Sequence, residues 1–219
     1  VTVEDLAPVF CEELAKQELN TKDRYIEIPE QVREFYRMYR PSPLMRAYRL
    51  EKALDMNAPV YIRLSGGIPS PVYLNDCELE IGKAHELRAG TDATIIAVGT
   101  MVSVALEAAS LLEAKGLSVG VADMWSLKPL DEDFVLKYAS SVSAIVTLEE
   151  HSVVNGLGSA VADVLAQHHS RARLTKLGLP DAYPPSVSPY PVMLEDYGLT
   201  AGQVAASVEK AIRSARESQ

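Results

Sequence analysis

The residues best suited to chemistry in this chain stand together near its middle, where Glu149, Glu150 and His151 follow an apolar run. A carboxylate can orient a histidine so that the imidazole acts as an acid or base near neutral pH. Either glutamate could do so here, and Glu150 and His151 are therefore candidate catalytic residues. The alternative is a structural role, in which one glutamate and the histidine only tie a loop to neighbouring backbone.

A glycine-containing turn, Gly156-Leu157-Gly158-Ser159, follows this group and opens a helix-like pattern. The first N–H groups of a helix lack partners within the helix, and its dipole favours negative charge there. Two glycines are too few for a dinucleotide-binding fingerprint, so free N–H groups at this turn predict a site for a small anion. The candidate substrate-binding or anion-binding residues are Arg63, Thr100, Ser126, His151, Gly156 and Gly158.

The elements that must position these residues are predicted by short apolar runs alternating with helical patterns, which is typical of βαβ units and a parallel sheet. The predicted parallel strands are Ala93–Val98, Leu117–Met124, Ala144–Leu148 and Arg173–Leu177. Right-handed crossovers place the turns after such strands along one edge of the sheet, where open α/β sheets bind ligands. Segments 99–100, 123–126 and 149–151 are therefore expected to meet at that edge.

Capping residues and prolines set the expected helix boundaries. Thr100 and Asp131 are the expected N-caps of two helices, since both side chains can accept a hydrogen bond from a first-turn N–H group. The last helix is expected to run from about Ala201 to Ser214. Before it, the proline-rich stretch 180–191 predicts a stiff irregular segment. Residues 79–87 have the spacing of a short edge strand or a turn.

Composition narrows the range of partners. The chain has 219 residues, is 47% hydrophobic and carries a formal net charge of −9, with no basic stripe, so we expect no nucleic acid partner. Cys11 and Cys77 are far apart and lie in no Cys/His cluster, which argues against a metal site or a disulfide scaffold. No apolar run is long enough to cross a bilayer, and a cytoplasmic protein without a membrane partner is predicted.

Three parts are predicted along the chain. Residues 1–57 form a helical, Arg- and Tyr-rich segment, which is either a packed cap or a surface for RNA or phosphate. Residues 58–90 contain a connecting strand, PVYIRL, and a linker. Within that strand Arg63 stands near two glycines, where it could meet a phosphate or form a structural ion pair. Residues 91–219 form the main domain.

From about Ala58 to Ile212 the chain resembles the carboxyl-terminal part of a transketolase, of the kind encoded as a separate subunit. The matching stretches are APVYIRL, EIGKAHELRAGTDATIIAVGTMVSVALEAASLL, ADMWSLKPLD, AIVTLEEHSVVNGLGSAVADVL, LGLPDAY and EDYGLTA. Deoxyxylulose-phosphate synthase and the beta subunits of 2-oxo acid dehydrogenases are also similar. The resemblance implies an α/β fold of three α/β/α layers with a five-stranded, mostly parallel sheet and one antiparallel edge strand, preceded by a short, mainly helical segment.

The resemblance also implies a function. Members of this family are thiamine diphosphate transferases that move a two-carbon ketol unit between sugar phosphates, as in the pentose phosphate pathway, with magnesium holding the diphosphate. In the family, thiamine diphosphate and magnesium are bound by two other domains, not by the carboxyl-terminal one. Only 58 residues precede PVYIRL here, and neither the Gly-Asp-Gly signature nor the activating glutamate motif is found. Where the family has arginine after Leu-Ser, this chain has Gly66.

The resemblance therefore predicts the carboxyl-terminal subunit of a split transketolase. Such a chain is inactive alone, forms homodimers, and needs an amino-terminal or pyrimidine-domain subunit to supply the cofactor. In that case residues 1–57 are a remnant or replacement of the pyrimidine-binding domain. One alternative is a non-catalytic regulatory or partner-binding module that holds a small anion at the carboxyl edge of the sheet. Another, a hydrolase using Glu150 and His151, lacks a nucleophile or metal.

Overall fold

The computed structural model describes residues 16, 72–73, 77–170, 172–182 and 188–217. The chain divides into two units, residues 1–68 and residues 69–219, and the second is described below. The predictions for residues 1–57, for the strand at 59–64 and for Arg63 lie outside the described residues. Within the described ranges, no helix is long and apolar enough to cross a bilayer.

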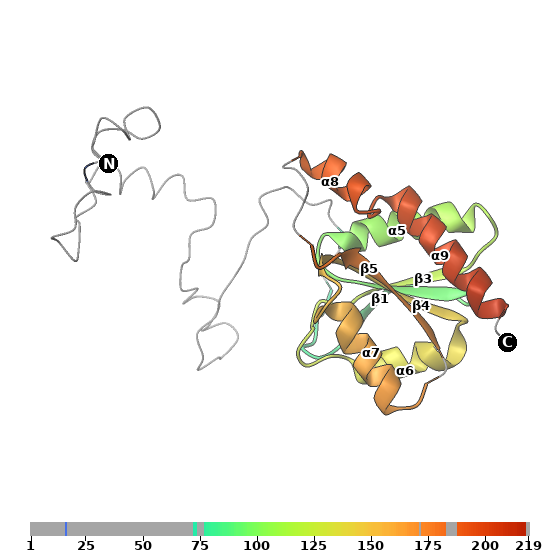
Figure 1. Cartoon of the computed structure of the whole chain (residues 1–219). Helices are drawn as coiled ribbons and strands as arrows, with labels where there is room; N and C mark the ends of the chain where they lie inside the picture. The colour runs from blue at the N-terminus through green and yellow to red at the C-terminus, as the bar shows by residue number, and fades with distance from the viewer. Residues whose placement is uncertain (1–15, 17–71, 74–76, 171, 183–187, 218–219) are drawn as a thin grey trace. The chain divides into compact units, whose positions relative to one another are not determined.

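A five-stranded sheet forms the centre of this unit, with strand order β1-β3-β2-β4-β5 (Figure 1). Four neighbouring strands are parallel, and β1 pairs antiparallel with β3 at one edge. The predicted mostly parallel sheet with one antiparallel edge strand is therefore confirmed. The strands are β1 His85–Arg88, β2 Ala93–Ala97, β3 Val119–Asp123, β4 Ala144–Ser152 and β5 Arg173–Leu179.

Helices cover both faces of the sheet, so the predicted three layers are confirmed (Figure 1). One face carries α5 and α9, and the other carries α6 and α7. A further short helix, α8, precedes α9. The helices are α5 Met101–Glu113, α6 Glu132–Ser141, α7 Leu157–Gln167, α8 Tyr190–Asp196 and α9 Ala201–Arg216.

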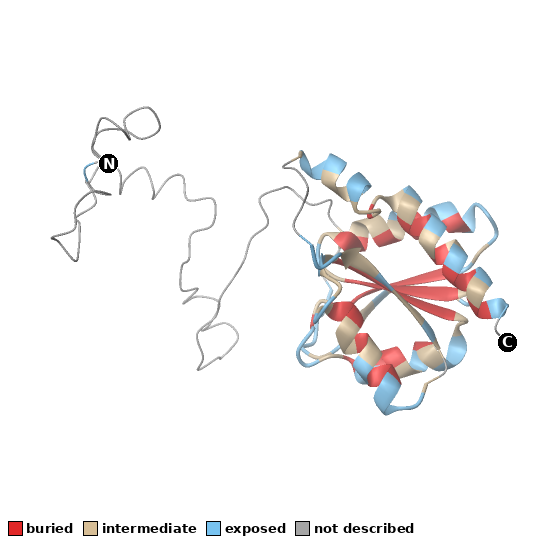
Figure 2. Ribbon diagram, viewed as in Figure 1, coloured by how far each residue is buried: buried red, intermediate tan, exposed pale blue. Residues whose placement is uncertain are grey.

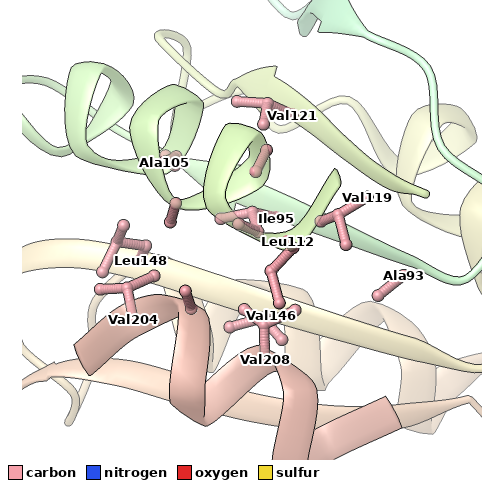
Figure 3. Packing of buried hydrophobic residues seen from close by; sticks show 14 of the residues in the cluster. Ala93, Ile95, Ala105, Leu112, Val119, Val121, Val146, Leu148, Val204 and Val208 are labelled. Atoms are coloured by element: carbon pink, nitrogen blue, oxygen red, sulfur yellow. The ribbon is translucent and has the colours of Figure 1, made fainter. Parts of the chain in front are cut away.

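Successive residues of the central strands supply two separate cores. Ile95 of β2 packs on the α5 and α9 side, whereas its neighbour Ile96 packs on the α6 and α7 side, and neither side chain is exposed. Because both faces are covered, the strands read as continuous apolar runs rather than as alternating patterns. Figure 3 shows the first core, in which Val146 of β4 and Val208 of α9 belong to the same buried cluster.

The helix starts agree with the sequence in part. Asp131 caps α6 as predicted, because its Oδ1 accepts a hydrogen bond from the backbone N–H of Phe134 at 3.1 Å. The last helix begins at Ala201 as predicted. Thr100 occupies the N-cap position of α5, but its side chain makes no capping hydrogen bond, so the predicted cap interaction is wrong there.

Helix α8 corrects the prediction of an irregular stretch up to Pro191. It begins at Tyr190, with Pro191 in its first turn. Proline is tolerated at that place because the N–H group that it lacks would have no partner within the helix. None of the seven residues of α8 is buried, so no apolar periodicity marks this helix in the sequence.

Candidate functional site

The candidate residues that the structure describes lie along the carboxyl edge of the sheet, the edge at which the parallel strands end. Strands β3, β2 and β4 are neighbours and run parallel, so the segments that follow them come out side by side. The prediction that segments 99–100, 123–126 and 149–151 gather at one edge is therefore confirmed. Because β1 is antiparallel, the turn that precedes it also reaches this edge.

Glu149 is a buried residue that caps the start of α7. Its side chain is only 1% exposed. Its two carboxylate oxygens accept the backbone N–H groups of Leu157 and Gly158, each at 2.8 Å. The expectation of free N–H groups for an external anion at this turn is therefore wrong, since the protein's own carboxylate already occupies the positive end of the helix dipole.

Gly156 makes this arrangement possible by having no side chain. A Cβ atom at Gly156 would lie 2.0 Å from Oε2 of Glu149 and 2.7 Å from the backbone oxygen of Ser152. These distances are far inside van der Waals contact, so only glycine lets the turn pass over the carboxylate. The two glycines of this turn therefore serve close packing: a Cβ at Gly158 would similarly strike the Lys176 side chain.

Glu150 points to the other face of β4 and joins two helix starts. Its Oε2 accepts a hydrogen bond from the Thr100 hydroxyl, at the start of α5, and one from the Tyr190 hydroxyl of α8 at 2.9 Å. Burial, and to a smaller extent the carboxylate of Glu150, raises the pKa of Tyr190. Thr100 therefore binds Glu150 instead of capping its own helix.

His151 is not oriented by either glutamate. Glu149, Glu150 and His151 lie in the last part of β4, which ends at Ser152, so this strand is longer than the predicted Ala144–Leu148. The carboxylate of Glu149 is bonded to the start of α7, and that of Glu150 to two side-chain hydroxyls, so neither bonds to the imidazole. The imidazole is exposed, and within the described part of the chain it makes no side-chain hydrogen bond.

Ser126 holds two segments of the carboxyl edge together. Its hydroxyl accepts the backbone N–H of Gly82 at 2.9 Å and donates to the backbone oxygen of Pro129 at 2.8 Å. The side chain is 7% exposed. Both hydrogen-bonding directions of this hydroxyl are therefore used by the fold, in a contact between the turn before β1 and the loop after β3.

Asp123 is a buried carboxyl that is not among the candidate site residues, although segment 123–126 was expected at this edge. Its Oδ2 accepts the Tyr73 hydroxyl at 2.8 Å, while Oδ1 has no hydrogen-bond partner among the described residues. His85 is its cross-strand partner and stacks edge-on against the Tyr73 ring, with the ring centres 5.3 Å apart. Burial raises the pKa of Asp123 and also that of Tyr73. The available signal was an aspartate at the end of a buried strand.

The described residues do not fit the diphosphate and magnesium ion that the resemblance implies. The N–H groups at the start of α7 are taken by Glu149. No group of three or more His, Cys, Asp or Glu within the described ranges could hold a metal ion. No catalytic step is therefore assigned to this edge through either group.

A cavity of about 400 Å³ lies at the opposite, amino edge of the sheet, and none of the described candidate residues lines it. It is formed by the segment between α5 and β3 and by the second half of α9 with the residue that follows it. One ion pair joins its two sides, with Nζ of Lys115 2.7 Å from Oε2 of Glu209. Within α9, Arg213 also pairs with Glu209. The lining residues are Lys115, Leu117, Glu209, Ile212, Arg213, Arg216 and Glu217.

Comparison with known proteins adds three findings. The family model described as "Transketolase, C-terminal domain" matches residues 82–204, more than half of the chain. A 1-deoxy-D-xylulose-5-phosphate synthase of Heliobacterium modesticaldum is 40% identical over 162 residues, which are 72% of this chain and 25% of that protein. A protein of Phocaeicola vulgatus, named as one subunit of an apulose-4-phosphate transketolase, is 39% identical over 143 residues, 64% of this chain and 45% of that protein.

A solved structure agrees with the sequence matches. It is described as a split gene transketolase, an inactive beta4 tetramer, and is 43% identical to this chain with a TM-score of 0.68. The match covers 75% of this chain and 54% of that one. The chain thus spans between a quarter and about half of the length of these relatives.

Proposed function

Because the chain belongs to the family of transketolase C-terminal domains, we propose that it is the carboxyl-terminal section or subunit of a thiamine diphosphate enzyme. That enzyme transfers a two-carbon ketol unit between sugar phosphates. The observation that carries the proposal is the family match over residues 82–204. It covers all of the sheet and four of the five described helices, and it stops inside α9.

The proposal includes dependence on a partner chain. Two relatives are named as parts of larger enzymes, one as a transketolase subunit and the other as a split gene product that is inactive as a beta4 tetramer. The carboxyl edge of this chain offers neither free N–H groups for a diphosphate nor a carboxylate cluster for magnesium among the described residues. Thiamine diphosphate and magnesium are therefore assigned to an amino-terminal or pyrimidine-domain subunit.

The role of this domain within such an enzyme is to fold independently and to support the assembly. Two buried clusters, one on each face of the sheet, give it a core of its own. The candidate polar residues at the carboxyl edge bond to one another, as in Thr100 with Glu150 and Ser126 with Gly82. The proposal also includes homodimer formation and a cytoplasmic location.

The test is to recover the tagged chain from its own cells and determine the native mass, the co-purifying proteins and the thiamine diphosphate content. We expect a stoichiometric partner that carries thiamine diphosphate, and ketol transfer by the complex with a panel of ketose and aldose phosphates. The isolated chain should neither bind the cofactor nor catalyse transfer. Stoichiometric cofactor binding by the isolated chain, or a native complex without thiamine diphosphate, contradicts the proposal.

A further inference from the structure

Exposed large apolar side chains gather at the carboxyl edge. Seven large hydrophobic residues are exposed in the described ranges, and six of them lie on segments of this edge. Only Leu111, on α5, is elsewhere. Figure 2 shows the central strands buried and most of the exposed residues on the loops and helices around them. The six are Leu79, Ile81, Leu127, Val154, Tyr190 and Val192, with exposed fractions between 40% and 62%.

Three of these residues, Leu79, Ile81 and Leu127, are defined here as the edge ridge. The turn that carries the first two is bonded to the loop that carries the third, since the N–H of Gly82 donates to the Ser126 hydroxyl. A second bond, from the N–H of Ala84 to the Asp131 carboxylate at 2.9 Å, fixes the same turn to the start of α6. The edge ridge is therefore held in place in the free domain, and a preformed apolar surface loses little entropy on binding.

An acidic rim accompanies the edge ridge. Four exposed carboxylates lie on the loops of the carboxyl edge and at the first residue of α6, and none forms an ion pair within the described part of the chain. Lys83 is occupied by Asp131 and Asp133, which leaves Lys128 as the exposed cation of these loops without an ion pair among the described residues. The four carboxylates are those of Glu78, Glu80, Glu132 and Asp181.

We propose that the carboxyl edge, centred on Ile81 of the edge ridge, is the docking surface for a partner protein that presents apolar side chains within a basic rim. This inference rests on the proposed function, because it assigns this surface to the cofactor-bearing partner chain. An apolar centre excludes water while rim charges select and orient the partner, which is the usual anatomy of protein interfaces.

The rim argues against a second copy of this chain as the occupant. Two copies that meet through this surface would bring the unpaired carboxylates of Glu78 and Glu80 close to the acidic rim of the other copy. Like charges facing each other across an interface oppose association. A partner with lysines or arginines around its apolar patch is attracted by the acidic rim. Its binding therefore weakens as salt screens this attraction.

The experiment uses the partner chain identified in the native complex, separated from the full-length chain and re-mixed with purified variants. The measurement is the dissociation constant by biolayer interferometry at 50 mM and 500 mM salt. Ile81→Asp places a charge in the centre of the edge ridge, and Glu80→Lys reverses one rim charge. Leu111→Asp is the matched control, because Leu111 is similarly exposed, at 44%, but lies outside this edge.

We expect Ile81→Asp to weaken binding at least tenfold, which corresponds to about 1.4 kcal/mol. Glu80→Lys should weaken it several-fold at low salt and less at high salt, while Leu111→Asp leaves the dissociation constant unchanged. Circular dichroism and the urea midpoint of each variant check that the fold is kept. If Ile81→Asp binds like Leu111→Asp, the docking surface is overturned while the proposed function stands, because the complex itself has been isolated.

Two further outcomes also overturn the docking surface. If no partner is recovered and sedimentation shows that Ile81→Asp converts a self-associated chain to a monomer, the occupant is a second copy. If no partner is recovered and the wild-type chain is monomeric, the surface has no protein occupant. In both of these cases the proposed function fails as well, which distinguishes them from the first.

Discussion

The two edges of the sheet are stabilised by different kinds of interaction. At the amino edge, exposed ion pairs join neighbouring elements, as in Arg88 with Glu113 at 2.9 Å and Lys115 with Glu209 at 2.7 Å. At the carboxyl edge the decisive charge, Glu149, is buried and bonded to backbone N–H groups, while apolar side chains are left in water. Water screens the ion pairs at the amino edge, so each should contribute little to stability. At the carboxyl edge, a buried and fully bonded carboxylate lies beneath a surface of exposed apolar side chains.

The largest effect should follow from removing the buried carboxylate. Glu149→Ala leaves the N–H groups of Leu157 and Gly158 buried without acceptors and removes the negative charge at the start of α7. We expect the free energy of unfolding to fall by about 3 kcal/mol, which is measured by urea denaturation. Glu149→Gln, which keeps one acceptor oxygen, should lose roughly half as much.

Glu150→Ala is the control for that experiment, since it removes the next carboxylate of the same strand. Glu150 is half-buried and bonds to two side-chain hydroxyls, so its loss should cost only about 1 kcal/mol. Suppose that Glu149→Ala and Glu150→Ala lower the free energy of unfolding equally. The bonds of Glu149 to the N–H groups of α7 would then contribute no more than the bonds of Glu150 to the two hydroxyls, which would contradict the importance of the buried charge.

A smaller loss should come from Gly156→Ala. The new Cβ would collide with the Glu149 carboxylate, so the turn must shift and the hydrogen bonds to α7 must lengthen. We expect a loss of about 2 kcal/mol in the free energy of unfolding. Gly202→Ala is the control, because nothing lies within 4 Å of its added Cβ and alanine favours the helix, giving a gain of up to about 1 kcal/mol. A neutral Gly156→Ala would contradict the close packing.

Much of this fold could be predicted from the sequence because it depends on local patterns. The apolar runs marked β2, β3 and the first half of β4, since strands buried on both faces need continuous apolar residues. Asp131 marked the start of α6 because capping is a contact over three residues. The common edge of the candidate residues followed from the handedness of the crossovers.

The site itself could not be predicted, because its contacts are set by tertiary pairing. Strand β4 continues to Ser152 through pairing with Leu179 of β5 after a shift in register, and no strand propensity in Glu-Glu-His indicates this. That continuation decides which carboxylate faces α7 and which faces α5. The Asp123 and Tyr73 pair joins residues 50 positions apart, so it too has no local signal.

Asp123 offers a pH-dependent comparison within the carboxyl edge. Burial raises its pKa in the folded protein, so the stability associated with the neutral carboxyl is present at low pH and is lost as the pH rises through the raised pKa. Asp123→Asn cannot ionise. The stability of this variant relative to the wild type should therefore increase between the ordinary carboxyl pKa and the raised value, then level off.

The measurement is a series of urea denaturations from pH 3 to pH 8 for the wild type and Asp123→Asn. Asp181→Asn serves as the control, because Asp181 lies on the same edge but is exposed and forms no ion pair among the described residues. A relative stability of Asp123→Asn that falls with rising pH would mean that the Tyr73 hydroxyl and His85 outweigh burial at this carboxyl.

The smallest effect belongs to the amino edge, where Arg88 of β1 meets Glu113 at the end of α5. Their side chains are 25% and 68% exposed, so water screens most of their attraction. A double-mutant cycle with Arg88→Met and Glu113→Gln should give a coupling energy of about 0.5 kcal/mol that fades in 1 M salt. The contrast between the two edges requires this coupling energy to be several times smaller than the fall in the free energy of unfolding caused by Glu149→Ala. A coupling energy as large as that fall, and insensitive to salt, would mean that the amino edge also depends on a strong charge interaction. The contrast between the two edges would then be wrong.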